Sequence, residues 1–403
     1  MFLVGKTVIL SADFNMRIQG GLIFTEDGRF QKGDLVIADG KIKSMYFTTE
    51  ENELSSSKEE TVLPAENLYV LPGFIDIHMH GCMGVDFCDA NKETFETIEN
   101  YQMQNGITTV FPATMTLPEE KLSEVFASVA QYVKVSKYNV FAGVTMEGPF
   151  LSKGKKGAQE EKFLCKPNAV FFERLWKKSN GLICQVAVAP EEDGAMEFIQ
   201  EISEKTVVSV AHSTADYETA TAAFQEGATH VTHLFNGMNP FLHREPGIVG
   251  AALENPTVSV ELICDGIHIH PAMVRTVFKL FGAKRVCMIS DSLSATGMAD
   301  GEYVLGGQRI VKKGEVATLQ DGTLAGSVCN LYECFKKTVL EMQIPLEQAV
   351  LSCTKTPAKS LGVEKKYGIL KEGRNADLLI VDDKLNIRYI FKKGKMISPE
   401  LYE

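Results

Sequence analysis

The sequence of 403 residues lacks several features that would place it in other classes of protein. No apolar run approaches the roughly 20 residues that a membrane helix needs, and the N-terminus has no basic stretch followed by an apolar one. Acidic residues outnumber basic ones, 52 against 41, and the net charge of −11 argues against a protein that binds nucleic acid through its phosphates. We therefore expect a soluble protein with neither a membrane nor a nucleic-acid partner.

Cysteine is present nine times, but never in CxxC spacing and mostly inside apolar runs. An odd number of such residues disfavours a disulfide framework and favours reduced packing residues. The GxSxG motif of serine hydrolases is also absent. These absences predict a cytoplasmic protein and give no sign of a serine nucleophile.

Short strand-like runs separated by turn signals occupy the first seventy residues, and the same texture returns after Gly373. Within the first seventy residues, the polar segment Glu50 to Thr61 has the composition of a surface loop. The expected strands are Lys6–Leu10, Leu22–Phe24, Asp34–Ala38, Lys41–Tyr46, Leu378–Val381 and Ile387–Phe391. We predict that residues 1–71 and 366–403 pair into one small β-sandwich domain, which leaves residues 72–365 as the catalytic domain.

In the central segment, apolar runs typical of buried parallel strands alternate with helical stretches, as in α/β proteins. Eight strands are expected: Phe74–Ile77, Thr108–Phe111, Val140–Met146, Leu182–Ala189, Val207–Ala211, Thr229–Thr232, Val258–Cys264 and Arg285–Ile289. Eight strands close a TIM-like (β/α)8 barrel. In the unit from 207 to 233, Ser213 or Thr214 is expected to cap a helix from Asp216 to Glu226.

Polar residues that can bind metal or move protons follow five of these strands. They are His78 and His80 after the first strand, Glu147 after the third, His212 after the fifth, His233 after the sixth and Asp291 after the eighth. The carboxyl ends of barrel strands line the active-site mouth, so we expect these six side chains to converge. Imidazole and carboxylate are the ligands of zinc and related divalent ions.

Each of these residues also has a structural interpretation when it is taken alone. Two histidines in HxH spacing point to the same face of a strand, where they can bind an ion or simply be buried. Asp291 could be a helix N-cap or could accept a proton from water and pass it to a leaving group. His230 is expected to face away from His233, and we interpret it and His270 as structural.

Longer motifs resemble the amidohydrolase superfamily and, within it, the N-acetylglucosamine-6-phosphate deacetylase family. The resemblance spans nearly the whole chain in order and spacing. The motifs are Gly73–Gly81 (GFIDIHMHG), Gly84–Phe87, Met146–Phe150 (MEGPF), Lys156–Ala158, Thr232–Met238 (THLFNGM), Asp265–His268, Ser290–Ser292 with Ala295–Gly297, Gly322–Ser327 and Gly373–Asp377.

The resemblance implies a metal-dependent hydrolase that removes the acetyl group from a phosphorylated amino sugar. Glu147, His212 and His233 would hold one divalent ion, His78 and His80 would help to hold a second, and Asp291 would be the catalytic acid and base. The implied substrate contacts are Ala158, Asn236, Gly237, Arg244, His268, Leu324, Ala325, Gly326 and Ser327. The expected cofactor is one or two divalent ions, with zinc or iron expected, and the expected assembly is a homodimer with Arg244 near its interface.

The chemistry fits these residue types independently of the resemblance. An acetamide is a poor electrophile with a poor leaving group, so a metal must polarise its carbonyl or activate water. Arg244 would suit a phosphate because its guanidinium is a fixed cationic fork, although a surface ion pair is the structural alternative. Gln159 stands where the family commonly has histidine, which leaves the contact made there open.

Three other functions compete with this one. A close alternative is the deacetylase for N-acetylgalactosamine 6-phosphate, because a few contacts distinguish the two epimers. A cyclic amidase similar to dihydroorotase commonly bridges its metals with a modified lysine, whereas this chain offers Glu147. A non-catalytic barrel scaffold should have gaps among the ligands, and all the positions are filled here.

Overall fold

The computed structural model describes residues 15–47 and 61–397. Contacts divide the chain into two compact units, which meet at Gly73 and at Lys365 along the sequence. Two expected features, the strand Lys6–Leu10 and nearly all of the polar segment Glu50 to Thr61, lie outside the described residues.

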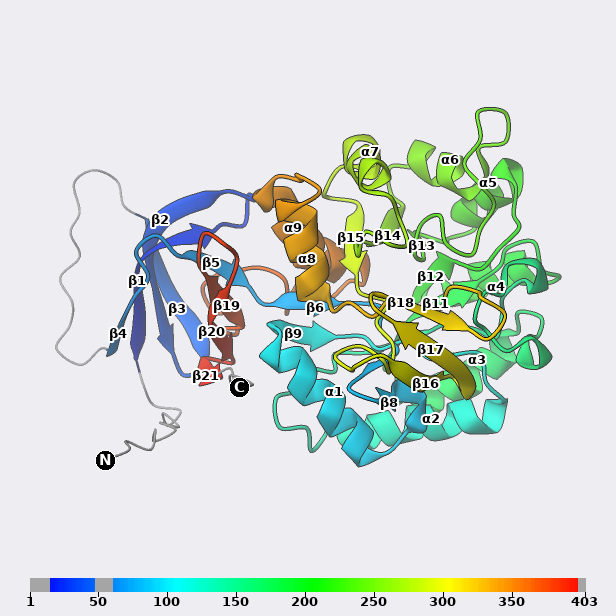
Figure 1. The fold of residues 1–403 in the computed structure, drawn as a ribbon, viewed down its shortest axis with the longest axis horizontal. Coiled ribbons are helices and arrows are strands. Elements are labelled where there is room, and N and C mark those ends of the chain that lie inside the picture. Colours follow the sequence, from blue (N-terminus) through cyan, green and yellow to red (C-terminus); the bar gives the residue numbers. More distant parts are fainter. Residues whose placement is uncertain (1–14, 48–60, 398–403) are drawn as a thin grey trace. The chain divides into compact units, whose positions relative to one another are not determined.

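The smaller unit contains strands from both ends of the chain in one eight-stranded sheet (Figure 1). The strands are β1 (Met16–Phe24), β2 (Phe30–Ala38), β3 (Lys41–Phe47), β4 (Thr61–Pro64), β5 (Tyr69–Pro72), β19 (Leu378–Val381), β20 (Ile387–Lys392) and β21 (Lys395–Ile397). Their order is β21-β20-β19-β5-β1-β2-β3, with β4 pairing to β1. The antiparallel pairing of β5 with β19 joins the two ends of the chain, and apolar residues from both ends share one core.

The larger unit is mixed α/β and is built on parallel strands. Six of them form the sheet β10 (Val144–Met146), β11 (Ile183–Val188), β12 (Val207–Val210), β13 (His230–Val231), β14 (Ser259–Ile263) and β15 (Val286–Ile289). The other two, β6 (Phe74–Asp76) and β9 (Ile107–Val110), pair in parallel with each other. All eight strands expected in this segment are therefore present, mostly shorter than predicted.

Helices follow these strands along the chain and lie outside the sheet (Figure 1). They are α1 (Lys92–Gln104), α2 (Glu119–Tyr132), α3 (Ala169–Lys178), α4 (Ala195–Ile202), α5 (Tyr217–Gln225), α6 (Gly247–Glu254), α7 (Pro271–Phe281), α8 (Leu331–Leu340), α9 (Leu346–Cys353) and α10 (Lys355–Ser360). Their buried faces cover strands whose residues are buried on both sides. None of the helices in the described part of the chain is long and apolar enough to cross a bilayer.

The helix expected after β12 is present, but its cap differs from the prediction. Asp216 is the N-cap of α5, and its carboxylate accepts the backbone N–H of Thr219 at 2.8 Å. Ser213 and Thr214 are not available for this role, because their hydroxyls donate to Glu191. The prediction failed because the carboxylate that engages these hydroxyls lies more than twenty residues away in sequence.

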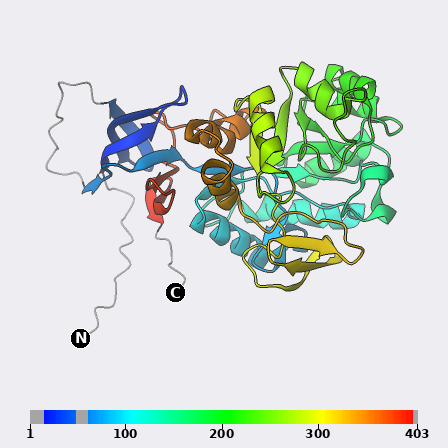
Figure 2. The same cartoon turned by 45° about the horizontal axis from the view of Figure 1, so that its top comes forward.

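Two small antiparallel sheets follow β6 and β15 along the chain, and the second of them is the yellow sheet in Figure 2. One pairs β7 (Gly81–Cys82) with β8 (Val85–Asp86), and the other joins β16 (Gly301–Leu305), β17 (Gln308–Lys313) and β18 (Val316–Leu319). The backbone N–H of Gly306 donates to Asp86 at 2.7 Å, which ties the two sheets together. This contact places the turn after β16 beside the segment that carries His80.

Candidate metal centre and active site

Every ligand candidate lies just beyond a strand of the larger unit. Glu147 directly follows β10, and His212 and His233 each lie two positions after the end of their strands, β12 and β13. His78 and His80 were expected at the end of the first strand, but β6 ends at Asp76. The N–H of His78 turns instead to Asp76 Oδ1 at 3.3 Å. The two rings nevertheless reach the same site, because their Nε2 atoms both face Glu147.

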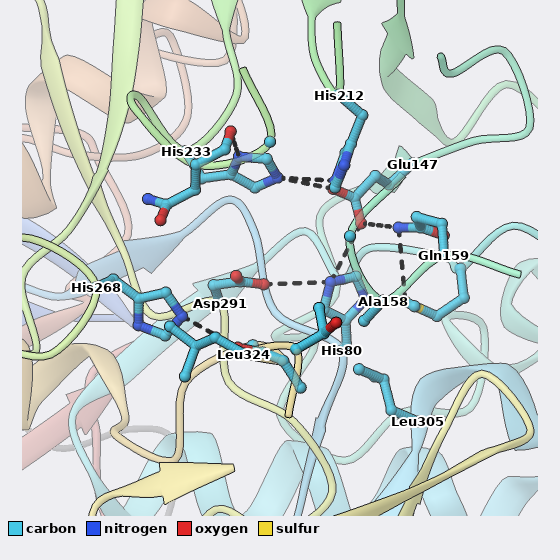
Figure 3. A pocket seen from close by; sticks show the side chains of 17 residues that line it. His80, Glu147, Ala158, Gln159, His212, His233, His268, Asp291, Leu305 and Leu324 are labelled. Carbon is cyan, nitrogen blue, oxygen red and sulfur yellow. Dashed lines mark hydrogen bonds and ion pairs between the residues drawn. The ribbon is translucent and has the colours of Figure 1, made fainter. Parts of the chain in front are cut away.

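Glu147 lies at the centre of the cluster (Figure 3). Its Oε1 lies 3.1 Å from the Nε2 atoms of both His212 and His233, and these two Nε2 atoms are 3.1 Å apart. On the other side, Nε2 of His80 lies 3.3 Å from Glu147 Oε2, and Nε2 of His78 lies 3.6 Å from Oε1. One carboxylate therefore serves two groups of possible ligands, Glu147 with His212 and His233, and Glu147 with His78 and His80.

Backbone carbonyls fix the tautomer of three of the four histidine rings. Nδ1 of His80, His212 and His233 faces a backbone carbonyl, of Ala113, Lys155 and Asn236 respectively, and a carbonyl can only accept a hydrogen bond. Each Nδ1 must therefore carry a proton, which leaves the Nε2 lone pairs directed into the cluster.

The donor set fits a divalent ion. Nε2 lone pairs at 3.1 Å repel each other unless a positive charge lies between them. Ligand atoms around a tetrahedral zinc ion are roughly 3.3 Å apart, given bond lengths of about 2.0–2.1 Å. Nε2 of His78 is buried and has no hydrogen-bond partner among the described residues, which is unusual for a polar atom unless it binds a ligand.

The carboxylates of the cluster favour a positive charge at its centre. Burial lowers the pKa of the His80 imidazole, but hydrogen bonds to Asp291 and Glu147 more than offset burial and raise the pKa to about 9. Burial would raise the pKa of Glu147, yet the surrounding histidines hold it well below its usual range. The same field that holds a proton on His80 would attract a metal cation.

Asp291 faces the cluster from the end of β15. Its Oδ1 lies 3.2 Å from Nε2 of His80, as Figure 3 shows. The alternative role as a helix N-cap is wrong, since no helix follows it. Gly326 packs against its backbone so closely that a Cβ atom there would lie 2.6 Å from the Asp291 carbonyl oxygen. Burial raises the pKa of Asp291, but His80 and the other histidines bring it below its usual value, so the side chain is a carboxylate.

A cavity of about 270 Å³ opens over Glu147 and Asp291. Of the predicted site residues, it is lined by His80, Glu147, Ala158, His212, Asn236, Gly237, His233, His268, Asp291, Leu324, Ala325 and Gly326. His78 and Ser327 are buried beside it, and exposed Arg244 lines a separate hollow with residues of α5 and the following loop. No Ser, Cys, Lys or Arg is among the described residues that line the cavity.

The position of Gly237 leaves no room for a side chain. A Cβ atom at this residue would lie 2.8 Å from Nδ1 of His212, and the backbone has a positive φ of 63°. The loop after β13 can therefore approach the imidazole of His212 only with glycine at this point.

Gln159 contacts the protein with both ends of its amide. The backbone N–H of Thr116 donates to its Oε1 at 2.7 Å, which fixes the orientation of the amide, since an N–H cannot face another donor. Its Nε2 then donates to Glu147 Oε2 at 2.8 Å. The residue that departs from the family pattern thus orients the central carboxylate.

Sequence reasoning missed two buried carboxylates near the site. Glu261 on β14 contacts the rings of His78 and His230, and Asp265 accepts a hydrogen bond from His268 at 2.6 Å. Burial would raise the pKa of Glu261, but the two histidines hold it below its usual range. The available signal for Glu261 was its position as the one acidic residue inside the apolar run Val258–Cys264, since a buried strand carries a charge only where that charge is paired.

His230 and His270 lie outside the cavity, and His270 caps α7.

Known proteins with similar sequences and structures point to the same chemistry. The model of the amidohydrolase family matches residues 69–397. N-acetylglucosamine-6-phosphate deacetylase of Bacillus subtilis (strain 168) is 33% identical over 93% of this chain and 95% of its own, and N-acetylgalactosamine-6-phosphate deacetylase of Escherichia coli O157:H7 is 30% identical over 93% and 97%.

The solved structure of a mutant N-acetyl-D-glucosamine-6-phosphate deacetylase from Mycobacterium smegmatis in complex with N-acetyl-D-glucosamine-6-phosphate is also similar. It has a TM-score of 0.87 and 30% identity, and the match covers 95% of this chain and 99% of that one. With the family model covering most of the sequence, the chain belongs to the amidohydrolase family, as its motifs predicted.

Proposed function

We propose that this protein hydrolyses the acetamide bond of N-acetylglucosamine 6-phosphate to release acetate and glucosamine 6-phosphate. The observation that carries this proposal is the position of Glu147 between two groups of histidines, with the Asp291 carboxylate 3.2 Å from His80 in the same cavity. The relatives named for this reaction support it. The proposal is metal-dependent hydrolysis, and none of the described cavity residues offers a serine or cysteine nucleophile.

We assign the metal ligands from the two groups around Glu147. Glu147, His212 and His233 would hold one divalent ion, and His78 and His80 would hold a second together with Glu147. Zinc or iron suits imidazole and carboxylate ligands, and manganese and cobalt are compatible with them. Such an ion polarises the acetamide carbonyl and lowers the pKa of water towards neutrality.

Asp291 acts as the general base and then as the general acid. Its carboxylate form is ready to accept a proton from the attacking water, and its Oδ1, 3.2 Å from His80 Nε2, lies beside the proposed second ion. Asp291 then passes this proton to the sugar nitrogen, because an amide anion cannot leave at neutral pH. One group can perform both steps because the proton that it takes up is the proton that the leaving amine needs.

His268 and the backbone around the cavity would bind and orient the sugar. Nδ1 of His268 donates to Asp265, and its Nε2 lies 3.0 Å from the Ala325 carbonyl. Burial would lower the pKa of His268, but Asp265 raises it above its usual value, and in the imidazolium form the Nε2–H would pass from the Ala325 carbonyl to the acetyl oxygen of a bound substrate. We assign further substrate contacts to cavity residues Ala158, Asn236, Gly237 and Leu324–Gly326, and to Ser327 beside them.

The sugar phosphate would be bound best by a cation, and the described residues that line the cavity include no Lys or Arg. Arg244 lies instead on an exposed loop beside Phe241 and Leu242, whose apolar side chains are 40% and 48% exposed. We propose a homodimer in which this loop packs against a second copy and Arg244 contacts the phosphate bound there. Arginine suits this contact because its planar fork matches phosphate oxygens.

We also propose that the eight parallel strands form a closed (β/α)8 barrel, with the β sheet of the two chain ends as a separate small domain. Backbone hydrogen bonds support closure on both sides of β6: Phe111 N–H donates to the Asp76 carbonyl at 2.8 Å, and Asp291 N–H donates to the His78 carbonyl at 2.9 Å.

The nine free cysteines support a location in the reducing cytoplasm.

The galactosamine epimer is the second candidate substrate. A relative that is 30% identical over 93% of this chain is named for N-acetylgalactosamine 6-phosphate, so the match to the glucosamine enzymes does not separate the two sugars. The two substrates differ at one hydroxyl, which a few contacts can distinguish.

An acetate-release assay with both sugar phosphates tests the function and the role of Asp291 together. We expect wild-type enzyme to release acetate faster from the glucosamine substrate. The Asp291→Asn variant should lose about 10²- to 10⁴-fold in kcat, the usual contribution of general acid and base catalysis, while its metal content is unchanged. Near-normal turnover in that variant would show that Asp291 does not have this role. The function would be refuted if wild-type enzyme released acetate from neither sugar phosphate.

A further inference from the structure

Glu261 is a fully buried carboxylate on β14 that takes no part in the proposed proton transfers. Its Oε2 lies 2.9 Å from Nδ1 of His78. The same Oε2 accepts the backbone N–H of His233 at 3.3 Å, and Oε1 lies 3.1 Å from Nε2 of His230 and accepts a hydrogen bond from Gln185 Nε2 at 2.8 Å. One side chain in the interior of the larger unit therefore joins β11, β13 and β14 to the histidine that follows β6.

The contact with His78 differs from the contacts of the other three candidate ligands. His80, His212 and His233 direct Nδ1 at neutral backbone carbonyls, whereas His78 directs Nδ1 at a carboxylate. A carboxylate partner fixes the imidazole orientation and makes the opposite nitrogen a stronger metal ligand. That opposite nitrogen is the buried Nε2 of His78 that has no hydrogen-bond partner among the described residues.

We propose that Glu261 is a positioning residue that makes the second metal site, His78 with His80 and Glu147, bind its ion tightly. The inference rests on the proposed metal-dependent function. Glu261 acts through His78 and does not touch the ion or the substrate. The other ion would depend on Glu261 less, because the carbonyls of Lys155 and Asn236 orient the rings of His212 and His233. Glu261 reaches His233 only through the backbone N–H, which the amide oxygen of a Glu261→Gln variant can still accept.

The Glu261→Gln variant tests this because it removes the charge and keeps the shape. The new amide oxygen can still accept the hydrogen bond of His78 Nδ1. Its NH2 group can donate to Gln185 Oε1, which has no partner among the described residues, once the Gln185 amide turns over. Full-length protein is dialysed against a series of buffered Zn²⁺ concentrations, and bound zinc is counted by mass spectrometry. We expect wild-type protein to bind two ions, and the variant to bind the second with a Kd about 10- to 100-fold higher while the first is unchanged.

Glu99→Gln is the matched control. Glu99 is also a buried carboxylate of the larger unit and accepts hydrogen bonds from Tyr132 and the backbone of Tyr138, but it has no contact with the site. This variant should lower thermal stability and still bind two ions. In a His78→Gln background, adding Glu261→Gln should change zinc binding no further, since His78 transmits the effect.

Three outcomes would overturn the inference: a second-ion Kd in Glu261→Gln within twofold of wild type, an equal loss in Glu99→Gln, or wild-type protein that releases acetate with a single ion. Wild-type protein that binds no ion and releases no acetate would refute the proposed function as well. If Glu261→Gln does not fold, Glu261→Asp keeps the charge but shortens its reach. It should weaken the same ion, and unchanged binding again rejects the proposal.

Discussion

The two histidine pairs around Glu147 are held in different ways. His212 and His233 have left-handed backbones, with φ of 43° and 25°, and backbone carbonyls orient both rings. The rings of His78 and His80 are oriented partly by side chains of other strands, since His78 contacts Glu261 and His80 contacts Asp291. The first pair therefore depends on the course of the main chain, and the second depends also on buried charges that single substitutions can remove.

Replacement of Glu147 should have the largest effect, because its carboxylate is common to both pairs. The Glu147→Gln variant keeps the shape but loses the anionic ligand of both ions. A metal contributes several kcal/mol to hydrolysis of this kind, so we expect acetate release to fall by about 10³-fold or more. Zinc per chain, measured beside kcat, should fall in parallel, whereas Glu99→Gln should keep both. Full metal content in Glu147→Gln would contradict the shared-ligand arrangement.

Replacing one pair at a time separates their contributions. His78→Asn with His80→Asn should leave one ion, and should lower kcat by roughly 10- to 100-fold because the second ion would no longer help to polarise the acetamide. His212→Asn should remove the other ion and cost more activity. Equal losses from the two changes would show that the pairs are equivalent, and unchanged zinc content in the double variant would exclude a second ion.

The sequence predicted the positions of the eight strands because buried parallel strands are continuous apolar runs, and it predicted which side chains meet around Glu147 because polar residues follow those runs directly. Its errors came from contacts between distant residues. The true cap of α5 is Asp216 because Glu191, more than twenty positions earlier in the chain, accepts hydrogen bonds from the hydroxyls of Ser213 and Thr214. Neither side-chain contact has a local signature in the sequence.

The residues that orient the ligands were also beyond sequence reasoning. An apolar run with one acidic residue, such as that around Glu261, indicates a buried charge but does not identify its partner. That partner, His78, lies 183 positions away along the chain. Prediction from one sequence therefore reaches the candidate metal ligands but stops before the residues that contact and orient them.

As pH rises from 6.5 to 9, the stability of the metal-free protein should fall, whereas the affinity for the second ion should rise. In metal-free protein the pKa of His80 is about 9, above the ordinary value of 6.5, so protonated His80 stabilises the fold fully below pH 6.5 and this stabilisation is lost as pH rises through 9. Zinc must displace that proton, so affinity for the second ion should rise by about tenfold per pH unit over the same window. Urea unfolding with chelator and with zinc, between pH 6 and 10, measures both trends. A metal-free protein that gains stability over this window would contradict the assignment.

Gln159 offers the smallest and most selective change. Its Nε2 donates to Glu147 Oε2, the oxygen that faces His80 alone among the four histidines, whereas Oε1 faces His212, His233 and, at 3.6 Å, His78. Gln159→Leu should therefore weaken the second ion by about tenfold and the first ion less. Gln159→His should bind zinc nearly as wild type does, because a neutral imidazole can accept the Thr116 N–H and donate to Glu147 as the amide does. If Gln159→Leu lowers the zinc affinity of both sites equally, the orientation of Oε2 does not matter to the second site alone. The whole Glu147 carboxylate would then act as one ligand.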